Sequence, residues 1–364
     1  MRIEELETPA IVVDLDILEA NLQRMADYSA AHGLSLRPHT KTHKIPAIAH
    51  MQLRLGSGGI TVAKVGEAEV MAAAGVDDIL VHYPVLGQSQ LQRLARLASD
   101  RKITVAIDSS ATAQAMSNAA KEAGSTIYVL VELDTGMRRC GVSSASEALS
   151  LAQLITGLPG LELAGLTTYP GHIWVAPGEQ ASSLRQVGEK LQEARTLLLR
   201  SGISCETVSA GSTPTAFNTH LAEGLTEMRP GTYVFNDRNT AGVGAVRLED
   251  CALRVLVTVV STAVSGRAIV DGGSKTFSSD RSRAGGDTGH GYIVEQPAVE
   301  FAAMSEEHGH LDLNDSGYSP RVGDKLSVIP NHVCPCVNMH DALYYHRNGV
   351  VEGCWQVAGR GKVR

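Results

Sequence analysis

The sequence predicts a (β/α)8 (TIM) barrel followed by an antiparallel β domain. Over roughly the first 240 residues, short apolar runs rich in β-branched residues alternate with helix-length stretches. About eight such units fit a closed barrel better than an open sheet. After Thr240, closely spaced β runs separated by Gly, Asp and Ser replace the helices. We therefore expect a barrel domain over residues 10–240 and a β domain over residues 241–364, which residues 1–9 would join.

Near-continuous apolar strands that alternate with helices are typical of a parallel sheet covered by helices. No G-x-G-x-x-G motif follows an early strand, so a dinucleotide-binding sheet is the weaker interpretation. The predicted barrel strands are Ala10–Leu15, Leu34–Arg37, Gly59–Ala63, Asp78–His82, Ile103–Asp108, Ile127–Asp134, Leu161–Thr168 and Cys205–Ala210. The predicted helices are Ile17–His32, Val65–Ala74, Ser89–Ser99, Ala111–Ala123, Ser146–Thr156 and Gly178–Arg200.

The β domain is predicted from runs without long helices between them. Asn348-Gly349 between two such runs is a strong signal for a two-residue hairpin. The predicted strands are Ala252–Val264, Arg267–Asp271, Val299–Met304, Lys325–Pro330, Ala342–Arg347 and Val350–Trp355.

Composition indicates a globular enzyme of the cytoplasm. The net charge of -7 and the absence of a basic block argue against nucleic-acid binding. No apolar run approaches the roughly 20 residues that cross a bilayer. Met1–Thr8 lacks an apolar secretory segment, so the six cysteines are expected to be thiols.

The segment Arg37–Lys44 contains two lysines, two histidines and an arginine between a strand-like and a helix-like run. Crowding by cations and partial desolvation favour the neutral amine of a lysine, which can then attack an aldehyde cofactor. We assign this role to Lys41, with Lys44 as its neighbour. The alternative is a basic strand end at the surface.

Barrel enzymes place their chemistry at the carboxyl ends of the strands. Gly211-Ser212-Thr213 follows a late strand, where backbone N–H groups and hydroxyls can hold a phosphate, although such clusters are also common in turns. Together with a nucleophilic lysine, this indicates pyridoxal 5'-phosphate (PLP). The other side chains expected at strand ends are His82, Tyr83, Arg138, Arg139, Tyr169 and His172.

These residues carry a resemblance to a known family. Lys41, Asp134–Gly141 and Arg229-Pro230-Gly231 resemble the alanine racemase-like, fold-type III PLP enzymes. The longer match, over nearly the whole chain, is to the D-threonine aldolase / D-serine dehydratase family within that group. It extends over Arg37–Lys44, Ser305–Gly309 and Pro330–Pro335, with Asn338 and Asp341.

The resemblance implies a role for each matching residue. Lys41 would form the Schiff base with PLP, Arg139 would lie near its phenolic oxygen and Tyr169 against its pyridine face. Arg229 falls where alanine racemases place an arginine on the pyridine nitrogen, a departure from the aldolases. The resemblance also implies a D-amino acid substrate and a homodimer with the active site near the subunit interface. The phosphate would be held by Ser212, Thr213, Gly231 and Thr232.

His332 and Cys334 match the family's metal motif. On a β-strand, residues i and i+2 point to one face, so both could reach one ion. Two protein ligands leave room for water and substrate. Imidazole and thiolate favour Zn²⁺ over Mn²⁺ or Mg²⁺. Cys334 and Cys336 could instead form a redox pair, and Cys336 could be a third ligand, but a buried thiol is the preferred interpretation of Cys336.

The sequence thus predicts a PLP- and metal-dependent lyase acting on D-β-hydroxy-α-amino acids, with Lys41, His332 and Cys334 in catalysis. Cleavage of Cα–Cβ, as in D-threonine aldolase, gives glycine and an aldehyde. Dehydration, as in D-serine dehydratase, gives a 2-oxoacid and ammonia. The whole-chain likeness favours the aldolase and Cys334 favours the dehydratase. A racemase is the third alternative; it would need a second acid/base, available among Tyr292, Tyr318 and Tyr344.

Overall fold

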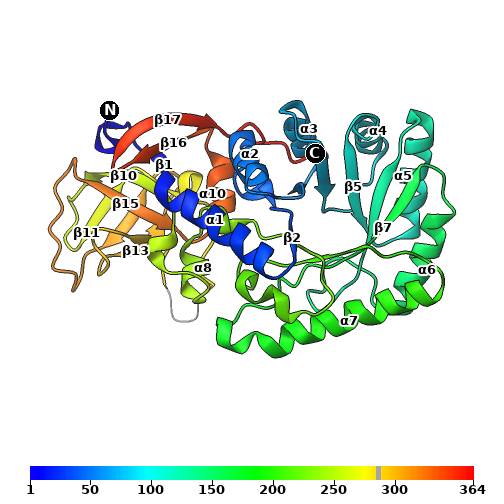
Figure 1. Cartoon of the computed structure of the whole chain (residues 1–364). Coiled ribbons are helices and arrows are strands. Elements are labelled where there is room, and N and C mark those ends of the chain that lie inside the picture. Colours follow the sequence, from blue (N-terminus) through cyan, green and yellow to red (C-terminus); the bar gives the residue numbers. More distant parts are fainter. Residues whose placement is uncertain (284–287) are drawn as a thin grey trace. The chain divides into compact units, whose positions relative to one another are not determined.

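The structure is a computed structural model that describes residues 1–283 and 288–364 (Figure 1). It divides into two compact units, which we describe separately. The α/β unit comprises Met25–Lys41, Pro46–Gly231 and Gly361–Arg364. The β unit comprises Met1–Arg24, Thr42–Ile45 and Thr232–Arg360.

An eight-stranded parallel sheet forms the centre of the α/β unit, in the order β2-β9-β8-β7-β6-β5-β4-β3. The two end strands of this order are β2 and β3. The segment that follows β2 pairs with β3: the N–H of Thr61 donates to the carbonyl of Pro38 at 2.8 Å, and His39 forms a parallel bridge with Thr61. The strands are β2 (Ser35–Leu36), β3 (Ile60–Val62), β4 (Asp78–Val81), β5 (Lys102–Ile107), β6 (Ile127–Glu132), β7 (Leu161–Thr167), β8 (Thr207–Ala210) and β9 (Glu227–Met228).

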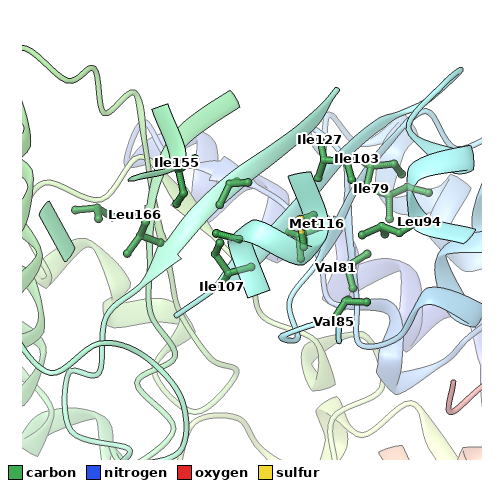
Figure 2. Close-up of a cluster of buried hydrophobic side chains, with 14 of the residues drawn as sticks. Ile79, Val81, Val85, Leu94, Ile103, Ile107, Met116, Ile127, Ile155 and Leu166 are labelled. Atoms are coloured by element: carbon green, nitrogen blue, oxygen red, sulfur yellow. The ribbon is translucent and has the colours of Figure 1, made fainter. Parts of the chain in front are cut away.

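Helices connect most of these strands and bury their apolar faces against them, as predicted. The two ends of α5 illustrate how the sequence sets the limits of a helix. At its start the side chain of Ser109 accepts from the N–H of Thr112, and at its end Gly124 adopts the left-handed conformation with φ 64°. Ile103 and Ile127 of the sheet lie in one buried cluster with helix residues such as Met116 (Figure 2). The helices are α1 (Leu15–Ala31), α2 (Pro46–Arg54), α3 (Val65–Ala73), α4 (Gln88–Leu97), α5 (Ser110–Ala123), α6 (Ala145–Thr156) and α7 (Ala181–Arg200).

The assignment of Ala10–Leu15 to the barrel sheet is wrong. β1 (Ala10–Asp14) pairs antiparallel with β10 and parallel with β16, both in the sheet of the β unit. The parallel sheet instead contains β9, which the sequence analysis did not predict. Four of the five residues of β1 are buried, which gives the same apolar pattern as a barrel strand. β9 has only two residues and begins with a glutamate, so it shows no apolar run from which a strand could be predicted.

The β unit contains a mixed sheet of nine strands among its described residues. One path runs β13-β14-β11-β10-β1-β16-β17, and β15 pairs with both β10 and β12. The predicted runs and the hairpin at Asn348-Gly349 are confirmed, whereas β12 and β14 were missed. The strands are β10 (Leu253–Ser261), β11 (Arg267–Val270), β12 (Gly291–Ile293), β13 (Glu300–Met304), β14 (Gly309–Asp312), β15 (Lys325–Pro330), β16 (Ala342–Arg347) and β17 (Val350–Gln356).

The expected placement of His332 and Cys334 on a β-strand is wrong. β15 ends at Pro330, and His332 is the N-cap of helix α10 (Val333–Met339). Pro335 explains the difference, because its missing N–H would break a strand ladder but costs nothing in the first turn of a helix. Two further short helices are α8 (Arg238–Gly242) and α9 (Ser274–Phe277). Within residues 1–283 and 288–364, no helix combines the length and apolarity needed to span a membrane.

Candidate functional site

Lys41 lies just beyond β2, in the short 3-10 helix Thr40–Thr42. Its Nζ is 5.7 Å from the ring centroid of Tyr169, which follows β7. Lys44 is placed differently: it is buried in the β unit and its Nζ donates to Oδ1 of Asn338 at 2.7 Å. Of the two lysines in the motif, Lys41 is therefore the one beside the strand-end side chains.

The loop after β6 presents Arg139 to the same ring. Oδ1 of Asp134 accepts from the N–H groups of Gly136 (2.9 Å) and Arg138 (3.0 Å), which folds the loop back on itself. Arg138 is left-handed, with φ 54°. Cζ of Arg139 is 4.7 Å from the ring centroid of Tyr169. Lys41 and Arg139 thus both lie beside one aromatic ring.

Arg229, directly after β9, is buried and bound through neutral acceptors. Its guanidinium donates to Oγ of Ser209, to the carbonyl of Thr168 at 2.8 Å and to Nε2 of His82 at 2.9 Å. Burial lowers the pKa of Arg229 to about 10. Burial and the positive charges of Arg229, Arg139 and Lys41 hold the pKa of His82 well below its usual range. His82 is therefore neutral.

The pKa of His39 is also held well below its usual range, by burial and by Lys41, His82 and Arg229. These basic groups, with Arg139, lower one another's pKa or that of a neighbour. None of the described hydrogen bonds of Arg229 goes to a carboxylate, although the buried Glu227 and Glu132 act on Arg229 through their charge. We call the set His39, Lys41, His82, Arg139 and Arg229 the basic cluster. Its electrostatics suit an anionic ligand.

Arg37, the arginine of the Arg37–Lys44 segment, is not part of the basic cluster and forms ion pairs with two carboxylates. Its Nε donates to Oε2 of Glu227 and its Nη1 to Oδ1 of Asp78, both at 2.6 Å. Oε1 of Glu227 in turn accepts from Oγ of Ser209 at 2.5 Å. Sequence reasoning missed this network. The available signal was that Glu227, the first residue of β9, lies two residues before Arg229, which directly follows the strand; in extended backbone this spacing places both side chains on one face.

The loop after β8 brings Gly211, Ser212 and Thr213 next to the chain at Arg229 and Gly231. Gly211 has φ 105°, a left-handed value that favours glycine, and a Cβ there would lie 3.3 Å from the backbone N of Arg229. Oγ1 of Thr213 accepts from the N–H of Gly231 at 3.2 Å. Ser212, Thr213 and Gly231 are thus brought together. Thr232 belongs to the β unit, where its Oγ1 is 3.8 Å from Sγ of Cys334.

His332 and Cys334 come together in the β unit despite the change from strand to helix. Their side chains are hydrogen-bonded to each other, and Nδ1 of His332 lies 2.6 Å from Oδ2 of Asp280. Burial lowers the pKa of His332, but Cys334, Asp237 and Asp280 outweigh it and raise the pKa to about 9. Sγ of Cys334 is also 3.3 Å from Oγ1 of Thr42.

Cys336 does not join this pair. It is buried, its Sγ donates to the carbonyl of Thr276 at 3.3 Å, and burial raises its pKa to about 12. Neither it nor Cys334 is in a disulfide. Across the described ranges 1–283 and 288–364, no group of three or more His, Cys, Asp or Glu side chains is arranged to hold a metal ion. A metal here would have two protein ligands.

Comparison with known proteins gives matches along the chain. The family model "Alanine racemase, N-terminal domain" matches residues 13–239, and the model "Putative serine dehydratase domain" matches residues 252–346. The chain is 37% identical to a D-threonine aldolase from Arthrobacter sp, covering 98% of this chain and 93% of the relative. It is 36% identical to a D-threo-3-hydroxyaspartate dehydratase from Delftia sp., covering 90% and 91%.

Solved structures agree with these matches. The D-threonine aldolase from Filomicrobium marinum superposes with a TM-score of 0.90 at 34% identity, covering 99% of this chain and 98% of that one. The Delftia dehydratase superposes with a TM-score of 0.91 at 32% identity, covering 98% of both chains. An alanine racemase from Clostridium difficile, at 15% identity and a TM-score of 0.71, shows the likeness of fold alone.

Proposed function

Because the chain belongs to the D-threonine aldolase / D-serine dehydratase family of alanine racemase-like PLP enzymes, we propose that it is a lyase of D-β-hydroxy-α-amino acids that uses PLP and a divalent metal. We further propose the aldolase reaction, which cleaves Cα–Cβ to give glycine and an aldehyde. The structural observation that carries the proposal is the basic cluster, with the amine of Lys41 beside the ring of Tyr169.

The residues of the α/β unit fit PLP, and we propose that its sheet is a closed (β/α)8 barrel that holds it. The basic cluster supplies positive charge for an anionic cofactor, and Gly211 opens a loop whose backbone can approach a phosphate. When bound, PLP supplies an electron sink for the bond broken at the α-carbon of an amino acid. The residues of this unit that would hold it are Lys41, Arg139, Tyr169, Ser212, Thr213, Arg229 and Gly231.

The chain's own groups prepare that site in three ways. Lys41 provides the amine for an aldehyde. Tyr169 provides an aromatic face beside Lys41 and Arg139. Neutral His82 accepts from Arg229, so the guanidinium is held by acceptors that do not cancel its charge. A full positive charge near the pyridine nitrogen would keep that nitrogen unprotonated.

His332 and Cys334 fit a catalytic divalent metal. Imidazole and thiolate suit Zn²⁺, and two protein ligands leave positions for water and substrate oxygen. Two solved structures of D-threo-3-hydroxyaspartate dehydratase offer support: one is a histidine-to-alanine variant and the other, in the metal-free form, a cysteine-to-alanine variant, at positions two residues apart. His332 and Cys334 have the same spacing. The ion would act as a Lewis acid on the β-hydroxyl.

The dehydratase reaction is the second candidate, favoured by the His332–Cys334 pair and by the match of the serine dehydratase domain over residues 252–346. Relatives carry both activities: 3-hydroxy-D-aspartate aldolase from Paracoccus denitrificans is 32% identical, and the Delftia dehydratase 36%. A racemase would need no metal and is the third candidate.

One experiment separates the three. Purified protein with PLP and Zn²⁺ or Mn²⁺ is incubated with D-threonine, D-serine or D-threo-3-hydroxyaspartate. We expect glycine and an aldehyde. A 2-oxoacid with ammonia would replace the aldolase by the dehydratase, and the L-enantiomer as sole product would indicate a racemase. A Lys41→Met variant, which lacks the amine, is the control for background chemistry.

A further inference from the structure

Asp280, in the segment between α9 and β12, contacts the imidazole of His332. Its Oδ2 lies 2.6 Å from Nδ1 of His332. On the premise of the proposed metal-dependent function, we propose that Asp280 is a positioning residue: its carboxylate accepts the Nδ1–H of His332, and this leaves Nε2 as the ligand nitrogen. Carboxylate–histidine–metal arrangements fix the tautomer and the ring orientation and raise the basicity of the ligand.

The other carboxylate near His332 does not compete for this role. Oδ1 of Asp237 accepts from the N–H of Thr240 at 2.9 Å, and its Oδ2 accepts from the N–H of Val333 at 3.2 Å. Both oxygens are therefore engaged by the first turns of α8 and α10. Asp237 acts on His332 through its charge, whereas Asp280 makes the direct bond.

The residue next to His332 holds Asp280 in place. Asn331 is 2% exposed, and its Nδ2 donates to the backbone carbonyls of Asp280 and Gly289, each at 3.0 Å. Its Oδ1 accepts from Arg238 at 3.3 Å. One buried amide therefore fixes the backbone on which the orienting carboxylate sits, immediately beside the imidazole that it orients.

The contact is better explained by metal binding than by folding. The side chains of His332 and Asp280 are 31% and 45% exposed, so the ion pair gains little from a low dielectric environment. Pairs of this kind contribute about 0–1 kcal/mol to stability. Variants at Asp280 should consequently fold, and their effect should appear in the affinity for the ion. Loss of such a partner typically weakens metal binding about 10–100-fold.

The test measures Zn²⁺ affinity by chelator competition on the PLP-loaded protein. We expect Asp280→Ala to raise the dissociation constant about 10–100-fold. Asp280→Asn should have a smaller effect, because its amide oxygen can still accept from Nδ1–H. Asp315→Asn is the matched control: Asp315 is exposed, has φ 61°, a conformation that Asn tolerates, and should bind Zn²⁺ like the wild type. In the Co²⁺-substituted protein, the visible bands should shift in Asp280→Ala and not in the control.

The outcomes separate the inference from the proposed function. If the wild type and His332→Ala bind Zn²⁺ equally, the metal function itself is overturned. If His332→Ala loses Zn²⁺ while Asp280→Ala binds like the wild type, only the role of Asp280 is overturned. A lower melting temperature of metal-free Asp280→Ala with unchanged Zn²⁺ affinity would show that the contact is structural, and this would also overturn the inference.

Discussion

Lys41 and Lys44 allow a decisive test of the proposed PLP site, because the structure predicts opposite effects for the same substitution. Methionine keeps the apolar stem of each lysine and removes the amine. Lys44→Met deletes a charged donor from Asn338 in a buried setting and should cost about 1.5–3 kcal/mol of unfolding free energy. Lys41→Met loses only the contact with Tyr169 at 5.7 Å, which is worth about 0.5–1 kcal/mol.

The effect on the cofactor should be reversed. Lys41→Met should lose the visible absorbance of bound PLP and the borohydride-trapped adduct, which peptide mass mapping would locate on residue 41 in the wild type. Lys44→Met should keep both. Unfolding free energy is measured by urea titration, and each variant controls for the other. An adduct that persists in Lys41→Met and disappears in Lys44→Met would refute the reasoning.

The remaining predictions address the cofactor face, the ion and the pH dependence. Tyr169→Leu and Arg139→Ala should each weaken PLP binding or shift its absorbance while circular dichroism stays unchanged; unaltered spectra and turnover in both would place them outside the site. Chelation should abolish turnover but leave the PLP absorbance, and Cys334→Asp should shift the preference from Zn²⁺ towards Mn²⁺; full activity without metal would exclude this role. Because the pKa of His82 is lowered from 6.5, the unfolded chain takes up a proton below about pH 6.5 that folded His82 does not. The unfolding free energy of the wild type should therefore fall as the pH drops below about 6.5, and His82→Gln should reduce the slope of this fall by about 1.4 kcal/mol per pH unit. An unchanged slope would contradict this.

Most strands and helices could be predicted because each carries a local pattern. The hairpin at Asn348-Gly349 is an example, since both residues have positive φ there. The sheet to which a strand belongs is not a local property. β1 is buried like a strand of a parallel sheet, yet its partners β10 and β16 lie more than two hundred residues away in the sequence.

The metal pair shows a different limit. His332 and Cys334 were predicted as a pair from the family's metal motif, but the reason given for their proximity was wrong, because helix α10, with Pro335 in its first turn, stands where a strand was expected. The contact of Asp280 with His332 could not be predicted from the sequence. Asp280 contacts His332 across 52 positions of the chain, and its backbone carbonyl accepts a hydrogen bond from the side-chain amide of Asn331. An isolated aspartate in a Gly- and Ser-rich stretch carries no pattern that indicates such a partner.

Only the structure distinguishes the basic residues of the α/β unit that form ion pairs from those that do not. Arg37 and Arg229 are both buried arginines, and Glu227 lies between them in the hydrogen-bond network. Arg37 donates directly to two carboxylates, whereas Arg229 is linked to Glu227 only through the hydroxyl of Ser209. Arg37 is therefore neutralised within the fold, whereas none of the described hydrogen bonds of Arg229 goes to a carboxylate, although Glu227 and Glu132 act on it through their charge. This difference, rather than the number of basic residues in the motif, supports our proposal that an anionic cofactor binds at the strand ends.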